Sequence, residues 1–243
     1  MNRESGRYSD DIDIFNDVLE RVELAALMDA EALTASGLTV IWIRRGPGFF
    51  SATVADGGDT TKVEWVHDSD FRFYPAVPDD VFGYMLHPVD LAVNKVAAAA
   101  DRSVARDMID LLTVHDRVLA LGTAVLAAVG RAVGWTPEGM LAEIRRHVSS
   151  ISREDYAQLA TSAPFDIDAA VVRLRAIIGE ADVFVRRMPP GCEGMLFLLD
   201  GHPVQPDPAH LDRYRRHAGK RRGHWPSSSD IGSAMLERYI KPT

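Results

Sequence analysis

Three strand-like runs between residues 38 and 68 constrain the fold more than any other feature of this chain. The runs are "LTVIWIRRG" (38–46), "GFFSATVAD" (48–56) and "TTKVEWVHD" (60–68), and they are separated only by "GPG" and "DGGD" turns. Connections this short favour antiparallel neighbours, because a parallel pair needs a long crossover. The sequence therefore predicts antiparallel strands in its first third.

A fourth strand is indicated by "DDIDIF", from residue 10 to residue 15. Its period of two places Asp11 and Asp13 on one face and Ile12 and Ile14 on the other. One face can then pack against a core while the other presents carboxylates. A helical pattern follows over residues 17–36 and stops at Ser36-Gly37.

Beyond a proline-rich segment that begins with "RFYP" (72–75), the pattern becomes helical for nearly all of the remaining chain. Residues 87–134 read as two or three helices, and Thr136 and Pro137 open another. Further helices are expected near residues 154–160, 166–187 and 229–239. We therefore expect an α+β protein with a strand-rich domain at 1–86 and a helical domain at 87–243.

Composition excludes several classes of protein. The net charge of −8 and pI of about 5.5 argue against nucleic-acid binding through an overall positive field. The sequence has no apolar run of membrane-spanning length and no readable secretory signal, so the cytoplasm is the expected compartment. Cys192 is the only cysteine, which excludes an intrachain disulfide and a thiolate zinc cluster. The histidines lack the spacing of a zinc hydrolase.

The paired aspartates point to a metal. Two carboxylates side by side on a strand repel each other, and a hard divalent cation with oxygen ligands relieves the repulsion. We expect a third carboxylate from a neighbouring strand, with Glu64 as the first choice and Asp70 or Asp68 at the strand end as alternatives. Such a site for Mg²⁺ or Mn²⁺ suits in-line displacement at phosphorus. A solvated face of an edge strand, whose charges discourage aggregation, is the alternative interpretation.

Two stretches of the chain, "GRYSDDIDIF" and "HPVDLAVNKVAAAADRSVARDMIDLLTVHD", together resemble the nucleotidyltransferase toxins of the AbiEii/AbiGii group. This group belongs to the DNA polymerase beta-like nucleotidyltransferase superfamily. The resemblance covers roughly residues 5 to 115. The matching positions are Arg7, Ser9, Asp11, Asp13, Asp90, Leu91, Asn94, Lys95, Ala98, Arg102, Arg106, Asp107, Asp110 and Leu111.

The resemblance implies a nucleotidyltransferase-like mixed sheet with flanking helices, followed by a helical domain that completes a cleft. Asp11, Asp13 and Glu64 would be the catalytic, metal-binding residues, and Glu64 could also draw the proton from an incoming hydroxyl. Lys95 would meet phosphate oxygens of an NTP. The other expected nucleotide-binding residues are Arg7, Ser9, Arg72, Asn94, Arg102, Arg106, Asp107 and Asp110. Ordinary surface ion pairs are the alternative for the last three.

One part of the superfamily pattern is missing. A Gly-Gly or Gly-Ser turn normally precedes the paired aspartates by about ten residues, whereas only four residues precede Ser5 here. Such a turn lets backbone N–H groups cradle phosphates. Either the sequence starts downstream of the true start, or the protein keeps the metal site without a complete phosphate cradle.

The functional hypothesis is a Mg²⁺-dependent nucleotidyltransferase that moves a nucleotidyl group from an NTP to an RNA, such as tRNA, or to a protein. It would act as the toxin of a toxin–antitoxin or abortive-infection pair, with a cognate antitoxin as partner. Two alternatives remain: a catalytically silent protein that binds nucleotide or a partner, and an antibiotic adenylyltransferase. The basic run "LDRYRRHAGKRRGHWPSSSD" (211–230) is a candidate RNA contact, or a solvated loop.

Overall fold

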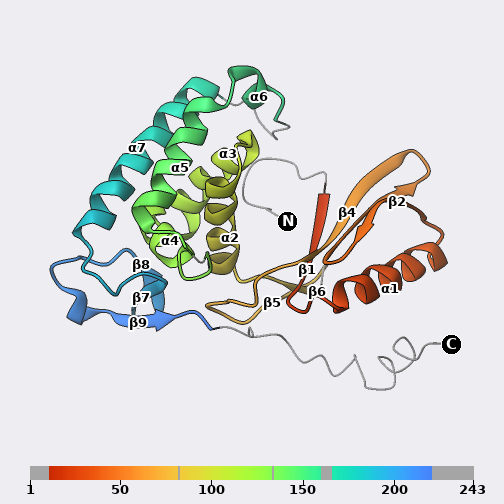
Figure 1. Cartoon of the computed structure of the whole chain (residues 1–243), viewed down its shortest axis with the longest axis horizontal. Helices are drawn as coiled ribbons and strands as arrows, with labels where there is room; N and C mark the ends of the chain where they lie inside the picture. The colour runs from red at the N-terminus through yellow and green to blue at the C-terminus, as the bar shows by residue number, and fades with distance from the viewer. Residues whose placement is uncertain (1–10, 82, 133, 160–165, 221–243) are drawn as a thin grey trace. The chain divides into compact units, whose positions relative to one another are not determined.

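The structure, a computed structural model, describes residues 11–220 except 82, 133 and 160–165. These residues form two compact units, 11–70 and 71–220 (Figure 1). The division falls earlier than the 86/87 boundary expected from the sequence. Segment 71–74 is hydrogen-bonded within the larger unit, because the Arg72 backbone pairs with Lys220 and Asp90 accepts from the N–H groups of Phe73 and Tyr74.

The smaller unit is a four-stranded mixed sheet with one helix. Its elements are β1 (Asp11–Asn16), α1 (Arg21–Ala35), β2 (Thr39–Gly46), β3 (Phe49–Asp56) and β4 (Asp59–His67). The strand order is β1-β4-β3-β2. The predicted antiparallel pairing of β2, β3 and β4 is confirmed, and β1 joins the far side of β4 in parallel.

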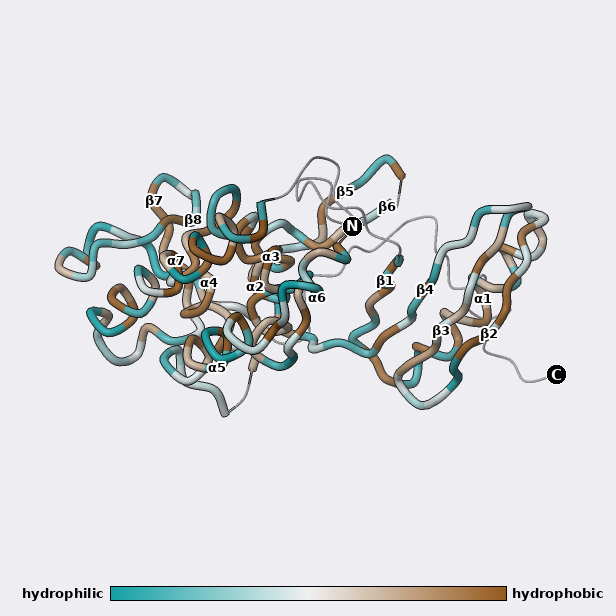
Figure 2. The backbone as a smooth tube through the Cα atoms, turned by 90° about the horizontal axis from the view of Figure 1, so that it is seen from above, coloured by the Kyte–Doolittle hydropathy of each residue, from teal (hydrophilic) through white to brown (hydrophobic). Residues whose placement is uncertain are grey.

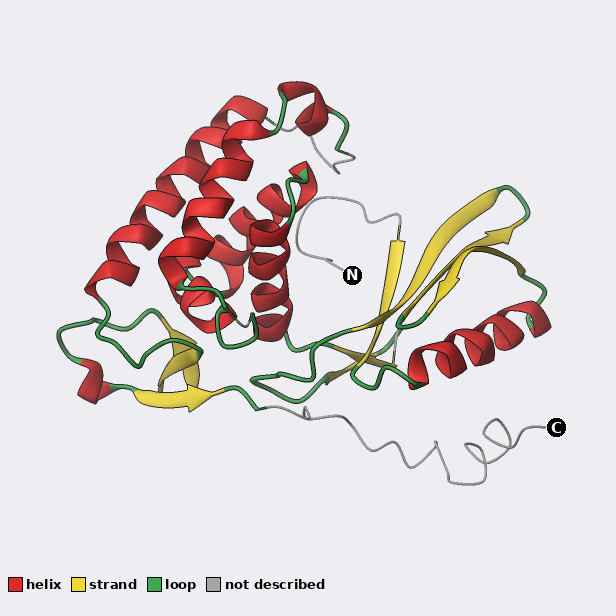
Figure 3. Cartoon of the chain, in the orientation of Figure 1, coloured by secondary structure: helices red, strands yellow, loops and turns green. Residues whose placement is uncertain are grey.

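Helix α1 packs on one face of this sheet (Figure 3). Val22 and Ala26 of the helix are fully buried, as are Ala52 of β3 and Trp65 of β4. Ile12 and Ile14 of β1 pack against the same cluster. Because side chains alternate along a strand, the carboxylates of β1 must occupy the other face.

The larger unit is mainly helical. Its helices are α2 (Pro88–Asp101), α3 (Ala105–Thr113), α4 (Leu121–Ala128), α5 (Pro137–Ser150), α6 (Arg153–Ala157) and α7 (Ile167–Arg187), with a π-helical turn at Val114–Val118. The predicted cap is confirmed, since Thr136 accepts from the N–H of Gly139 at 3.0 Å. Hydrophobic stretches of α2, α3 and α4 gather at the centre of this unit (Figure 2). The expected helix at 229–239 lies outside the described residues.

The larger unit is mainly helical, as expected, but it also contains short strands that the sequence pattern did not predict. The larger unit contains the hairpin β5 (Val77–Asp79) and β6 (Gly83–Met85), and a sheet of β7 (Met195–Leu199), β8 (His202–Val204) and β9 (Arg215–Ala218) in the order β8-β7-β9. A short 3₁₀ turn, Leu211–Arg213, precedes β9. The α+β class itself is confirmed.

Within the described residues, no single helix is long and apolar enough to cross a membrane. Segments Ala105–Val118 and Leu121–Ala128 pass that test only as a pair, and the chain bends by 108° between them.

Candidate metal centre

The parallel pairing of β1 with β4 determines the candidate site. Asp13 lies opposite Glu64, and Asp11 lies opposite Lys62. The intervening residues Ile12 and Val63, and Trp65 after Glu64, belong to the core on the helix side of the sheet. Strand alternation therefore places the four charged side chains on the sheet face opposite α1.

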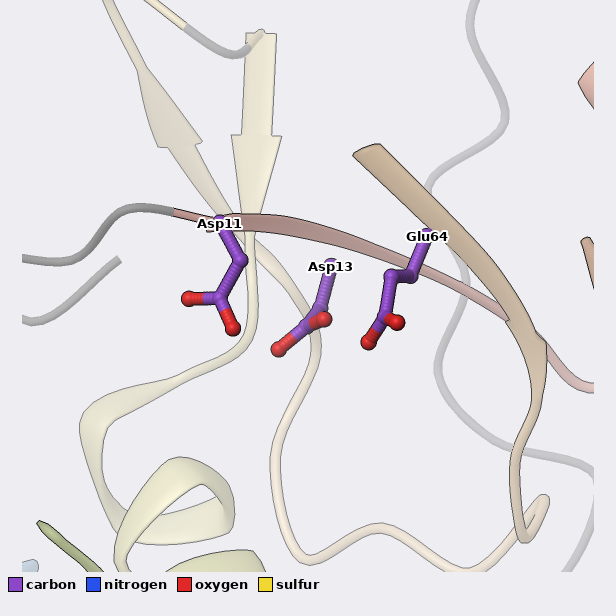
Figure 4. Close-up of side chains that lie close together, drawn as sticks. All are labelled: Asp11, Asp13 and Glu64. Carbon is purple, nitrogen blue, oxygen red and sulfur yellow. The ribbon is translucent and has the colours of Figure 1, made fainter. Parts of the chain in front are cut away.

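Three carboxylates converge on this face (Figure 4). One oxygen from each of Asp11, Asp13 and Glu64 lies within 4.8 Å of the others. Asp13 is exposed, whereas Asp11 and Glu64 are partly buried. The prediction that a neighbouring strand brings a third carboxylate to the pair is confirmed, and Glu64 is the residue that the structure brings there.

The donor set suits a hard cation. All three candidate ligands are carboxylate oxygens, which Mg²⁺ and Mn²⁺ prefer over the imidazole and thiolate donors of zinc sites. Mg²⁺ holds its ligands at about 2.1 Å, so opposite ligands are about 4.2 Å apart. A 4.8 Å spread needs only small side-chain adjustments to reach that geometry. In the described part of the chain, no other group of three acidic, histidine or cysteine side chains is arranged this way.

Lys62 is a charged neighbour of the triad. Its ammonium forms an ion pair with the carboxylate of Glu64, two residues along β4. The Lys62 side chain is 45% exposed and that of Glu64 is 16% exposed. The sequence already places Lys62 and Glu64 on one face, but sequence reasoning gave Lys62 no role.

The alternatives for the third carboxylate lie after β4. Asp68 is nearly buried, and its backbone N–H donates to the carbonyl of Asn16 at 2.8 Å. Neither Asp68 nor Asp70 belongs to the converging group. Glu64 alternates with the core residue Trp65 along β4, so its side chain lies on the face that carries Asp11 and Asp13.

The opposite face of β4 is tied to α1. The indole N–H of Trp65 donates to Asp29 at 2.7 Å. Burial raises the pKa of the Asp29 carboxyl, and the hydrogen bond from Trp65 offsets part of that rise. This bond links α1 to the strand that carries Glu64.

The second motif folds onto two neighbouring helices of the larger unit. Lys95 of α2 reaches Asp110 of α3, with 2.7 Å between the ammonium nitrogen and the carboxylate. The Asp110 side chain is fully buried, whereas that of Lys95 is 24% exposed. The spacing of the motif thus places its lysine against its last aspartate, a pairing that sequence reasoning did not predict.

Asp107 has a different partner. Its carboxylate accepts a bidentate pair of hydrogen bonds from Arg102, from Nε at 2.7 Å and from Nη2 at 3.1 Å, across the break between α2 and α3. Asp107 is buried and Arg102 is half exposed. The pair links the end of α2 to the first turn of α3.

Asn94 and Arg106 are partly buried on these two helices, and their expected contacts with nucleotide stay predictions.

Asp90 anchors the segment that enters the larger unit. Its two oxygens accept the backbone N–H groups of Phe73 at 2.7 Å and Tyr74 at 3.0 Å. Burial raises the pKa of Asp90, although both hydrogen bonds lower it. Phe73 is a buried core residue. Sequence reasoning missed this anchoring role of the motif aspartate.

Arg72 lies in the same anchored segment. It is 3% exposed, and its guanidinium donates to the carbonyl of Phe71 at 2.7 Å. Its backbone also bridges to Lys220. The described contacts of Arg72 therefore serve the fold of the larger unit, and its role toward nucleotide stays a prediction. Arg7 and Ser9 lie outside the described residues.

The described part of the basic run, residues 211–220, forms the short 3₁₀ turn and strand β9. Arg215 and Arg216 of β9 are exposed, and the phenol oxygen of Tyr214 accepts from the N–H of Asp207 at 3.1 Å. Tyr214 also lines a surface hollow of about 600 Å³ beside α7.

Cys192 is buried, and burial raises the pKa of its thiol. A raised pKa disfavours the thiolate, which is the nucleophilic form of cysteine.

Comparison with known proteins gives no further assignment, because no family model, curated protein or solved structure matches this chain.

Proposed function

We propose that this protein is a Mg²⁺- or Mn²⁺-dependent nucleotidyltransferase whose metal-binding residues are Asp11, Asp13 and Glu64. The observation that supports the proposal is the β1/β4 register, which pairs Asp13 with Glu64 and brings the three carboxylates within 4.8 Å. The motif resemblance supplies the reaction class. The acceptor is an RNA or protein hydroxyl, and the biological role is that of a toxin with a cognate antitoxin.

The three carboxylates would have different roles in metal binding and proton transfer. Asp11 and Asp13, neighbours on one face of β1, would bind the cation from one side, and Glu64 would complete the site from β4. When bound, the metal would neutralise the triphosphate and align the attacking oxygen. The partly buried position of Glu64 suits it to receive the proton of the incoming hydroxyl. The hydrogen bond between Trp65 of β4 and Asp29 of α1, on the other face of the sheet, holds the strand that carries Glu64 in place.

A transfer assay tests the proposal. The full-length chain is incubated with each of the four labelled NTPs, Mg²⁺ or Mn²⁺, and total RNA or protein as acceptor. We expect metal-dependent labelling that Asp13→Ala reduces at least about 100-fold, the usual weight of such electrostatic catalysis. Asp59→Ala, at the exposed start of β4, is the matched control and should keep full activity.

Two outcomes separate this proposal from the other classes. Metal and NTP binding without transfer to any acceptor would identify a silent nucleotide-binding protein. Transfer to an aminoglycoside but not to RNA or protein would identify an antibiotic-modifying enzyme. Growth arrest on expression that depends on Asp13 would support the toxin role.

A further inference from the structure

The carboxylate face of the smaller unit contains one lysine, and its contact is with a proposed metal ligand. Lys62 is the only lysine between residues 11 and 70. It stands opposite Asp11 across the parallel pair and two residues before Glu64. Its ammonium is engaged by the Glu64 carboxylate.

Because of this contact, a bound cation would compete with the Lys62 ammonium for the Glu64 carboxylate. A cation bound by all three carboxylates needs an oxygen of Glu64, and the ammonium of Lys62 already neutralises that carboxylate. An incoming metal must displace the ammonium or share the carboxylate with it. The affinity for bare metal is therefore lower than the three carboxylates alone would give, because part of the attraction is already satisfied.

Once released from Glu64, the Lys62 ammonium could bind phosphate oxygens of the substrate. Lys62 is 45% exposed and can swing on its flexible stem, whereas Glu64 is held on a packed strand. Once it leaves Glu64, the ammonium stays on the sheet face beside Asp11, where the anionic phosphates carried by the metal would lie. An ammonium is a good partner for phosphate oxygens.

We propose that Lys62 is a counter-ion switch that couples metal binding to triphosphate binding. In the free protein it holds Glu64 and weakens the binding of bare cation. In the complex it gives up Glu64 to the metal and contacts the triphosphate. The site thereby selects the metal–triphosphate complex over the metal alone. This inference rests on the proposed function and adds a substrate-binding residue to it.

The experiment compares two ligands on the same variants. Binding of Mn²⁺ alone is measured by electron paramagnetic resonance, and binding of the preformed complex of Mn²⁺ with inorganic triphosphate by calorimetry. Inorganic triphosphate is the probe because it carries no base. For Lys62→Met we expect Mn²⁺ alone to bind about fivefold more tightly and the Mn²⁺–triphosphate complex about fivefold more weakly, a typical coupling between sites.

Three variants serve as controls. Lys62→Arg keeps the charge and should bind both ligands like the wild type. Arg21→Met, in the first turn of α1 on the other side of the sheet, removes a charge without touching the site. It should leave both affinities within about twofold, because exposed charges at a distance are screened. Thr60→Met tests the effect of an added apolar side chain on β4.

The outcomes distinguish failure of this inference from failure of the proposed function. If Mn²⁺ binds the wild type and not Asp13→Asn, but Lys62→Met changes both affinities in the same direction or neither, the switch is wrong and the metal site stands. If neither the wild type nor Lys62→Met binds Mn²⁺, the proposed function fails together with the switch. Circular dichroism of each variant verifies that it is folded.

Discussion

Glu64 of β4 lies directly opposite Asp13 of β1 in a parallel strand pair, so two carboxylates far apart in sequence share one face of the sheet. With Asp11 they form a group whose negative charges repel one another. A bound cation would turn this repulsion into attraction, which makes stability a readout of the site.

Metal binding should therefore stabilise the protein. At Mn²⁺ concentrations about 100 times the dissociation constant, we expect the free energy of unfolding to rise by about 2.7 kcal/mol. Asp13→Asn should abolish this rise, because it removes one of the three carboxylate ligands. Asp59→Asn should respond to metal like the wild type. Equal metal responses of the wild type and Asp13→Asn in thermal unfolding would exclude the site.

The contact between Lys95 and Asp110 should contribute to stability whatever its role toward nucleotide. Lys95→Met removes the cation beside a fully buried carboxylate, and we expect a loss of about 3 kcal/mol in urea unfolding. In Lys95→Met/Asp110→Asn the loss should be at least about 1 kcal/mol smaller than the sum of the single losses. Arg186→Met, which breaks the exposed pair with Asp182 on α7, should cost less than about 1 kcal/mol. Additive losses would contradict the pairing.

The burial of Asp29 should make stability depend on pH in a defined direction. Burial raises the pKa of folded Asp29 above its ordinary value of 3.8. The stability that this group contributes is therefore complete below 3.8 and is lost as the pH rises through the folded pKa. The unfolding free energy of Asp29→Asn relative to the wild type should accordingly increase with pH above about 4. A pH-independent difference in urea unfolding would contradict the raised pKa.

Gly130 and Gly194 meet backbone to backbone in the larger unit, where the N–H of Gly194 donates to the carbonyl of Leu126 at 2.8 Å. A Cβ on Gly130 would lie 2.6 Å from the Cα of Gly194, so Gly130→Ala should cost about 1–3 kcal/mol. Gly179 of α7 has open space around it, and Gly179→Ala should stabilise by up to about 1 kcal/mol. Thermal unfolding of both variants measures the contrast. Similar effects of the two changes would contradict the close approach.

Local pattern predicted most of the smaller unit. Alternation in "DDIDIF" and "TTKVEWVHD" identified which side chains share a face, because a strand has only two faces. Local pattern also carried a signal that was missed. Asp200-Gly201 joins β7 and β8 with both residues at positive φ, 51° and 84°, as a two-residue Asp-Gly hairpin requires. The flanking "MLFLL" resembles a buried helix as much as a strand, and periodicity alone does not separate the two.

The sequence by itself determined the α+β class, the face on which Asp11 and Asp13 lie, and the short turns that make β2, β3 and β4 antiparallel. Tertiary structure decided which strand β1 joins and in which register, and hence that Glu64 completes the group and that Lys62 stands beside it. It also decided that Asp110 is held by Lys95 and that Asp90 binds the backbone of residues 73 and 74. The physical reason is the range of the interactions. Strand alternation and turn geometry depend on neighbouring residues, whereas strand register and buried ion pairs depend on packing between segments that are distant in the chain.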